Sequence, residues 1–187
     1  MKTIIQTSRA VAALTAILTC GVPAATFAAT SYLDVNGTNA GFWDGVTSPI
    51  SADLGTLLNW TTSAAGTTAP VIFPTGNGIQ IGAAPSDFDG AIINLTVNPT
   101  GTLGANPGVL NIVATNATVT FIPVGNAHWN HAYTWTVASG STLNLSGANL
   151  NFNAQLVTLA GGGTMNFSSV LGNNDSTTAG GITMNMP

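Results

Sequence analysis

The sequence has 187 residues, of which 45% are hydrophobic and 4% are charged, whereas about a quarter of the residues in an ordinary globular domain are charged. Its only basic residues are Lys2 and Arg9, and its six acidic residues are all Asp. A chain with no cationic side chain after Arg9 cannot neutralise a phosphate backbone, so we expect no nucleic-acid partner. The same composition argues against Arg or Lys clamps on anionic substrates and against a Lys Schiff base.

Residues 1–28 have the pattern of a secretory signal peptide. Both basic residues precede residue 10, an apolar run follows, and Thr26 and Ala28 are small residues placed for cleavage after Ala28. Acylation of Cys20, the only cysteine, is the alternative, but Ile17-Leu18-Thr19 precede it where lipoprotein processing requires a small residue. We therefore expect export to the cell surface or the medium and a mature chain without disulfides.

Residues 29–100 are interpreted as an N-terminal cap with the first strands. Five of the six Asp and two of the four Trp lie between residues 31 and 99. The open end of a repeat stack exposes core side chains and a strand edge, so we interpret Trp43 and Trp60 as plugs that cover it. No apolar stretch after residue 30 reaches the ~20 residues of a membrane-spanning helix, so no such helix is expected.

Apolar residues alternate with polar ones along much of the remaining chain, in short runs bounded by Gly, Asn, Pro or Ser. This period of two residues, with little helical periodicity, predicts an all-β protein with short strands. The alternating apolar sets are Ile93, Leu95 and Val97; Leu110 and Ile112; Val119 and Phe121; Tyr133, Trp135 and Val137; Leu143 and Leu145; Leu150 and Phe152; Val157 and Leu159; Met165 and Phe167; and Met184 and Met186.

The strands also repeat. Residues 114–121, 138–145 and 160–167 align at offsets of 24 (142 − 118) and 22 (164 − 142), and residues 182–186 follow at an offset of 19 (183 − 164). A repeat of this length with two or three short strands is typical of a parallel β-helix, or β-solenoid. Neutral outward residues suit such a stack, because like charges repel at the ~4.8 Å strand spacing. A β-sandwich with Greek-key turns is the alternative.

Several motifs together resemble a known family. Trp43-Asp44-Gly45 follows the leader closely, Asn59-Trp60 comes about 15 residues later, and residues 156–167 read LVTLAGGGTMNF. In these features the chain resembles bacterial proteins with autotransporter-associated β-strand repeats. The resemblance implies a right-handed parallel β-helix that is exported to the cell surface or medium and has a structural or adhesive role.

The C-terminal segment departs from that family. Such proteins usually continue for many more coils and end in a membrane β-barrel or another anchoring signal, whereas this sequence stops at Pro187 within a strand pattern. We therefore expect the β-helix repeats of residues 101–187 to be truncated. An unpaired C-terminal edge would then allow self-association.

Two polar motifs are candidates for metal binding or catalysis. His128 and His131 lie three residues apart in a strand pattern, which directs them to opposite sides, and the chain has no Glu and no Cys after Cys20 to complete a zinc site. Asp87 and Asp89 resemble the start of a calcium loop, and on a strand they would lie ~6–7 Å apart, as glycosidase carboxylates do. Because no acid follows before Asp175, a solvated turn is the preferred interpretation, with calcium binding and catalysis as alternatives.

The aromatic residues Trp129, Tyr133 and Trp135 share one side of a predicted strand. Exposed rings on a sheet face would form a glycan-stacking platform. Rings that share a side more often mark the buried face, because each ring buries roughly 150–250 Å². We therefore favour core packing and keep the glycan platform as the alternative.

These observations predict a non-catalytic structural or adhesin-like module that needs no cofactor. Its expected partners are surface glycans or other cells. The alternative function is a carbohydrate-binding or neutral-glycan-hydrolysing β-helix, since polysaccharide lyases and hydrolases use this fold. Polyuronate lyases depend on basic residues that the mature chain lacks, so only a hydrolase built on Asp87 and Asp89 fits the composition.

Overall fold

The computed structural model describes residues 29–37, 39–45, 48–74, 76–97, 108–124, 127–128, 133–146, 150–151, 155–168, 171–172 and 181–186. The described residues form strands, turns and bends without a helix, which confirms the predicted all-β class. Within these ranges, therefore, no helix has the length and apolar character needed to cross a membrane.

Fifteen strands lie within the described residues. They are β1 (Thr30–Leu33), β2 (Ile50–Asp53), β3 (Trp60–Thr61), β4 (Gly78–Ile81), β5 (Ile92–Val97), β6 (Gly108–Ile112), β7 (Thr118–Pro123), β8 (Ala127–His128), β9 (Tyr133–Val137), β10 (Thr142–Leu145), β11 (Leu150–Asn151), β12 (Leu156–Ala160), β13 (Thr164–Phe167), β14 (Leu171–Gly172) and β15 (Gly181–Asn185).

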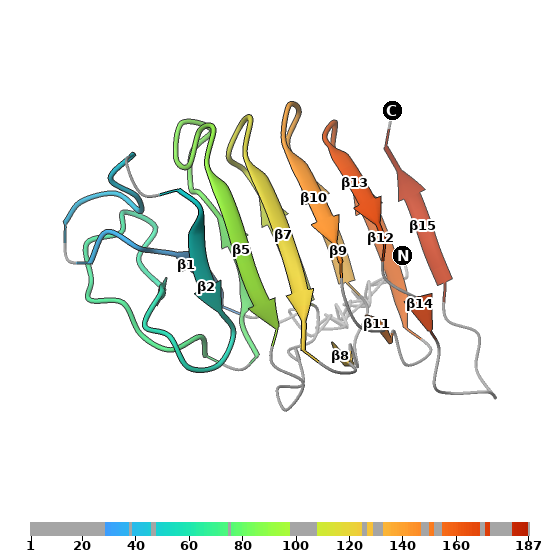
Figure 1. Ribbon diagram of the computed structural model, residues 1–187, viewed down its shortest axis with the longest axis horizontal. Helices are drawn as coiled ribbons and strands as arrows, with labels where there is room; N and C mark the ends of the chain where they lie inside the picture. Colours follow the sequence, from blue (N-terminus) through green and yellow to red (C-terminus); the bar gives the residue numbers. More distant parts are fainter. Residues whose placement is uncertain are drawn as a thin grey trace, which may run out of the picture.

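The strands form three sheets, whose strand orders are β15-β12-β9-β6-β4-β1-β3, β13-β10-β7-β5-β2 and β14-β11-β8. Successive strands enter different sheets: β9, β10 and β11 lie in three sheets, and β12 returns to the sheet of β9. Strands one turn of the chain apart therefore lie side by side, as β5, β7, β10 and β13 do in Figure 1. Among the described strands, every pair except β1–β3 is parallel, unlike the antiparallel pairing of a Greek-key sandwich.

The register of the sheets confirms two of the three predicted repeat alignments. Thr142 pairs with Thr118 in β7 and with Thr164 in β13, as the offsets of 24 and 22 require. The third alignment is wrong, because Thr183 of β15 pairs with Thr158 of β12 in the seven-stranded sheet. Both large sheets alternate polar and apolar residues in the same way, so the local pattern does not identify the sheet to which a strand belongs.

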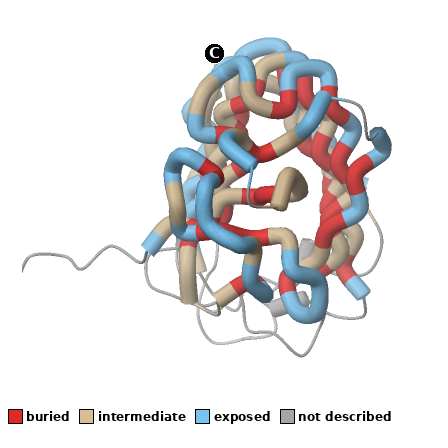
Figure 2. Tube along the Cα trace, turned by 90° about the vertical axis from the view of Figure 1, so that its left-hand side faces the viewer, coloured by how far each residue is buried: buried red, intermediate tan, exposed pale blue. Residues whose placement is uncertain are grey.

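The core lies between the inward faces of the two large sheets. Alternate residues of each strand point inward, and β7 and β9 show the pattern clearly, with every second residue buried. Seen from the end in Figure 2, buried residues follow the strands around a common interior. On the outward face, Asn166 Nδ2 donates to Asn144 Oδ1 at 2.9 Å, which joins equivalent side chains of neighbouring turns of the chain.

We call one passage of the chain through the sheets a layer. Short turns hold successive layers in register. The buried Ser141 hydroxyl donates to the Ala114 carbonyl at 2.6 Å and accepts from the Ala117 amide at 3.0 Å, so its polar atom is satisfied within the core. Gly161 adopts a φ of 99°, and a Cβ there would overlap the Val137 carbonyl. The turn after β12 therefore requires glycine for both its backbone conformation and its approach to the neighbouring layer.

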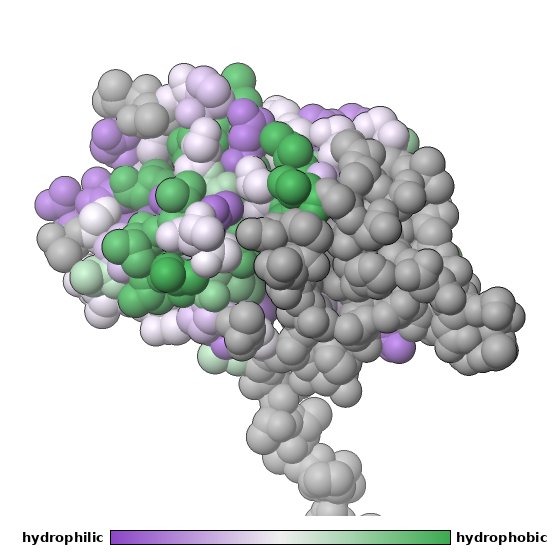
Figure 3. Space-filling view, turned by 60° about the horizontal axis from the view of Figure 1, so that its bottom comes forward, coloured by the Kyte–Doolittle hydropathy of each residue, from purple (hydrophilic) through white to green (hydrophobic). Residues whose placement is uncertain are grey.

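Aromatic residues fill the N-terminal end of the core. Trp60 is fully buried, packs edge-on against Phe73 at a centroid distance of 5.0 Å, and donates from Nε1 to the Asp53 carbonyl at 2.7 Å. Hydrophobic surface also gathers over the left-hand part of the molecule in Figure 3. The exposed large apolar side chains near Trp60 in sequence, and at and after its bridge partner Val71, are Leu57, Leu58, Val71 and Ile72.

Candidate functional site

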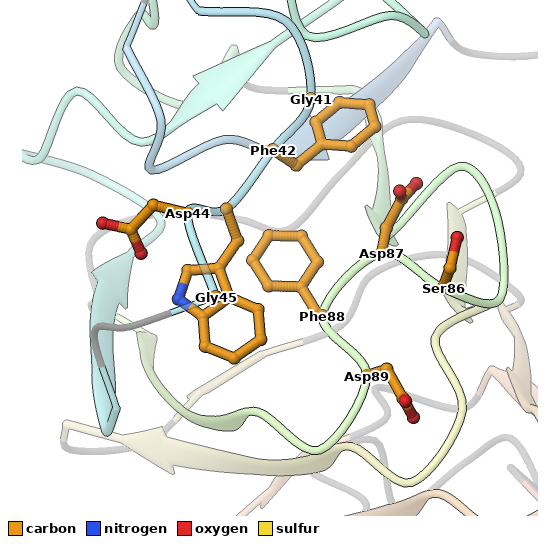
Figure 4. A pocket seen from close by; sticks show the side chains of 9 residues that line it. Gly41, Phe42, Asp44, Gly45, Ser86, Asp87, Phe88 and Asp89 are labelled. Atoms are coloured by element: carbon orange, nitrogen blue, oxygen red, sulfur yellow. The ribbon is translucent and has the colours of Figure 1, made fainter.

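The N-terminal end carries a cavity of about 370 Å³. Two loops form it: residues 41–45, which lie between β1 and β2, and residues 86–89, which lie between β4 and β5. Figure 4 shows the side chains of both loops around it. We refer to this cavity as the N-terminal groove.

Stacked aromatic rings form the inner wall of the groove. The Phe88 ring stacks on Trp43 at a centroid distance of 6.0 Å and an interplanar angle of 10°, and on Phe42 at 6.5 Å and 26°. Phe42 stacks in turn on Tyr32 of β1 at 5.6 Å. Phe42 and Phe88 are buried, whereas Trp43 is only half-buried. The stack therefore connects the hydrophobic core to a ring that reaches the surface.

Asp87 fixes the loop that presents Phe88. Its Oδ2 accepts hydrogen bonds from the Ala83 amide at 2.9 Å and the Ala84 amide at 2.8 Å, as Asp side chains do in tight turns. Phe88 itself adopts a φ of 58°, which is unusual for a bulky residue. Burial of the Phe88 ring in the aromatic stack offsets the cost of this conformation.

Asp89 joins the same loop to the turn before β7. Its Oδ1 accepts from Asn116 Nδ2 at 2.9 Å and from Thr115 Oγ1 at 3.2 Å. Among the described residues, no hydrogen bond reaches Oδ1 of Asp87 or Oδ2 of Asp89. One oxygen of each carboxylate is thus fixed in place by two hydrogen bonds.

The structure replaces the strand-based estimate of the separation between Asp87 and Asp89. The estimate of ~6–7 Å assumed an extended strand, whereas both residues lie in a turn. Their carboxylates point in different directions in Figure 4, because each bonds to a different neighbouring segment. Within the described part of the chain, no group of three or more His, Cys, Asp or Glu residues could hold a metal ion.

The other predicted site residues do not gather into a site in the described part of the chain. Tyr133 and Trp135 are 7% and 1% exposed and belong to the core, where Trp135 stacks on Phe167 at 6.5 Å. Burial raises the pKa of Tyr133. Their third predicted partner, Trp129, lies outside the described residues, as does His131, and His128 is described only as the backbone of β8. The two described rings therefore cannot serve as a surface platform.

Two carboxyl groups outside the groove lining, Asp34 and Asp53, have shifted pKa values. Asp34 is fully buried, and this burial raises its pKa against the opposing effect of the Asn36 amide, which donates to Oδ1 at 3.0 Å. Asp34 Oδ2 and Asn59 Oδ1 are buried acceptors that no described donor reaches. Burial of Asp53 opposes its ionisation, but hydrogen bonds from the Leu57, Thr56 and Gly55 amides and the Thr56 hydroxyl lower its pKa to about 2.

Sequence reasoning singled out Asp87 and Asp89 but missed the aromatic partners that make a groove. A signal was present, because the chain contains an aromatic-Asp-Gly triplet twice, at residues 43–45 and 88–90. Gly45 and Gly90 adopt φ values of 78° and 73°, so both triplets end in a similar turn. Trp43 and Phe88, the aromatic members of the two triplets, stack on each other.

Comparisons of the chain with protein-family models, with curated proteins and with solved structures found no match. The site is therefore assessed by its own chemistry. An aromatic wall edged by carboxylates supplies van der Waals contact and hydrogen-bond acceptors. Carboxylates that point apart do not form an acid and base pair acting on one bond. This arrangement is suited to binding rather than to catalysis.

Proposed function

We propose that the chain is a non-catalytic, exported structural module with an adhesive role at the bacterial cell surface or in the medium. In this proposal the three sheets belong to a right-handed parallel β-helix of the kind found in autotransporter-associated repeat proteins. The observation that carries the proposal is the parallel, in-register pairing of equivalent residues, such as Thr118, Thr142 and Thr164.

The energetics of this pairing suit an elongated structural module. Each layer contacts mainly the layer before and the layer after, so stability is approximately a sum over neighbours and length can vary without a change of design. Inward residues such as Val119 and Leu143 are fully buried between layers. The outward positions of the same strands are uncharged Thr, Asn and Ile122, which avoids repulsion between stacked like charges.

Removal of one whole layer tests the repeat design. Deletion of residues 142–163, which is 22 residues (164 − 142), joins Ser141 to Thr164 and puts β13 in the place of β10. We expect this variant to retain β-sheet circular dichroism and cooperative urea unfolding. Deletion of residues 142–152, about half a layer, is the control, and we expect it to unfold because its strands change sheets. Equal loss of structure in both variants would contradict the proposal.

Export is tested separately, with residues 1–28 fused to a phosphatase that is active only outside the bacterial cytoplasm. We expect phosphatase activity and an exported product that begins at Ala29. The control replaces Leu18 with Arg, which interrupts the apolar run and should keep the reporter inside. An inactive fusion with the native leader would remove the basis for a surface role.

A further inference from the structure

We propose that the N-terminal groove is a binding site for a neutral carbohydrate. This inference goes beyond the structural role, and it depends on the groove alone. At about 370 Å³, the groove falls within the ~300–1,000 Å³ range of small-molecule sites. It is formed by two loops that carry the same aromatic-Asp-Gly triplet and that meet through the stacked rings of Trp43 and Phe88.

The lining of the groove determines what kind of molecule fits. Among its aromatic lining residues, Phe42 and Phe88 are 3% and 1% exposed, so the half-buried Trp43 ring is the apolar surface that a ligand can reach. The edge is formed by Asp44, Ser86, Asp87 and Asp89, of which all but the half-buried Asp87 are exposed. Carboxylates accept hydrogen bonds and do not donate them when ionised. A matching ligand therefore presents an apolar face together with several hydrogen-bond donors. A pyranose ring has this combination, with C–H groups on its face and hydroxyls around its edge.

Charge excludes one class of ligand. Three Asp residues line the groove, and no Lys or Arg occurs after Arg9. Phosphates, sulfated sugars and uronates would be repelled at this site without a cation to offset the repulsion. The carbohydrate is therefore uncharged.

The arrangement of the acceptors argues against a simple cation. Oδ2 of Asp87 is held by the Ala83 and Ala84 amides, and Oδ1 of Asp89 is held by Asn116 and Thr115, so both carboxylates have fixed directions. Figure 4 shows that these carboxylates point apart, and that the Asp44 carboxylate lies on the opposite side of the Phe88 ring and points away from it. Acceptors spread around an aromatic wall match hydroxyls spread around a sugar ring, whereas an ammonium group or a metal ion needs acceptors that converge on one point.

The test measures binding of defined oligosaccharides to the exported chain by isothermal titration calorimetry. The neutral probes are the hexasaccharides of cellulose, chitin, mannan and xylan, and the charged probes are oligogalacturonate and oligolysine. We expect at least one neutral probe to bind, with an affinity that does not change between low and high salt. Binding to none of the neutral probes, or to a charged probe alone, would overturn the proposal.

Variants then locate the site. Trp43→Ala should weaken binding roughly tenfold, the equivalent of one stacking contact, whereas Phe167→Ala removes a half-buried ring far along the chain and should leave affinity unchanged.

Asp44→Ala should weaken binding, and Asp44→Asn should preserve it, because the amide oxygen still accepts a hydrogen bond from a sugar hydroxyl. Asp44 is exposed, so these two variants remain informative if Trp43→Ala does not fold. Native affinity in both Trp43→Ala and Asp44→Ala, or equal losses in Asp44→Ala and Asp44→Asn, would contradict a neutral ligand in this groove.

Discussion

The two ends of the molecule differ in how far the apolar residues of their alternating strands are buried. At the N-terminal end, Leu33 of β1 and Trp60 of β3 are fully buried. At the C-terminal end, Ile182 and Met184 of β15 are 39% and 70% exposed. Their partners in β12, Val157 and Leu159, are 0% and 1% exposed. The comparison shows that alternation determines which side of a sheet a residue faces, whereas burial also depends on a neighbouring layer.

The difference arises from how the sheets end. The seven-stranded sheet ends on the N-terminal side in the antiparallel pair β1–β3, and an additional bridge joins Trp60 to Val71. Aromatic side chains from loops between the strands, including Phe42, Phe73 and Phe88, complete the core there. The edge strand on the other side, β15, pairs only with β12 among the described strands.

Truncation of one large apolar residue at each end should have the largest effect on the free energy of unfolding, and the effect should differ strongly between the two ends. Trp60→Ala removes a fully buried indole and its hydrogen bond to the Asp53 carbonyl, and we expect a loss of ~3–5 kcal/mol in the free energy of unfolding. Met184→Ala changes a mostly exposed side chain, and we expect a change within ~0.5 kcal/mol. Urea unfolding of both variants measures the contrast. Similar losses would mean that the ends are equally well packed.

Asp53 should stabilise the N-terminal end at neutral pH. Its carboxylate accepts from the amides of Gly55, Thr56 and Leu57, and its pKa is lowered from 3.8 to about 2. A lowered pKa in the folded state gives stability that is present above about pH 4 and is lost as the pH falls toward 2. We expect Asp53→Ala to cost about 1–2 kcal/mol at neutral pH, with the difference narrowing in acid. A pH-independent difference in urea unfolding would contradict this assignment.

Asp34, in contrast to Asp53, should lower the free energy of unfolding at neutral pH. Burial raises its pKa, so its ionisation costs stability as the pH rises from the unfolded value through the folded value. Asp34→Asn removes that charge, while the amide oxygen of Asn can still accept the hydrogen bond from the Asn36 amide. We expect a gain of about 1 kcal/mol at neutral pH and none well below pH 4. Thermal unfolding at several pH values checks this sign, and destabilisation at neutral pH would refute it.

A substitution on the exposed edge strand β15 should have the smallest effect on stability, but it should change whether the chain self-associates. An unpaired strand edge pairs with other edges unless a charge blocks it, so light scattering should show a mass that rises with protein concentration. Thr183→Lys places a charge on β15 and should keep the chain monomeric. Thr120→Lys, on the outward side of the interior strand β7, is the control and should leave association unchanged. A native chain that stays monomeric at high concentration would contradict an open edge.

Much of the strand layout could be predicted from the sequence. Alternation identified the inward residues of β5, β7, β9, β10 and β12, because Gly, Asn and Ser turns separate short runs with a clear period of two. The repeat placed Thr118, Thr142 and Thr164 in register. It failed for Thr183, since the outward Thr positions of the two large sheets have the same local pattern.

The groove could not be predicted as a unit. It depends on contacts between residues 41–45 and 86–89, which are far apart in a region without a repeat. The two aromatic-Asp-Gly triplets are visible in the sequence, but their stacking depends on the left-handed backbone of Phe88 and on the turn that Asp87 holds. Local pattern reasoning preferred a solvated turn for Asp87 and Asp89, but it took the distance between their carboxylates from an extended strand, so it could not foresee that these carboxylates point apart.

The central claim is the parallel register of neighbouring layers, and disulfide trapping tests it most directly. The only native cysteine is Cys20, so a Cys20→Ser background leaves the introduced thiols without a competitor. Asn144→Cys with Asn166→Cys places thiols at paired positions of β10 and β13, whereas Asn144→Cys with Asn185→Cys places them in different sheets. We predict rapid oxidation to an intramolecular disulfide in the first variant only, detected by a mobility shift and by mass. Absence of that disulfide in folded protein, or equal oxidation of both variants, would contradict the account.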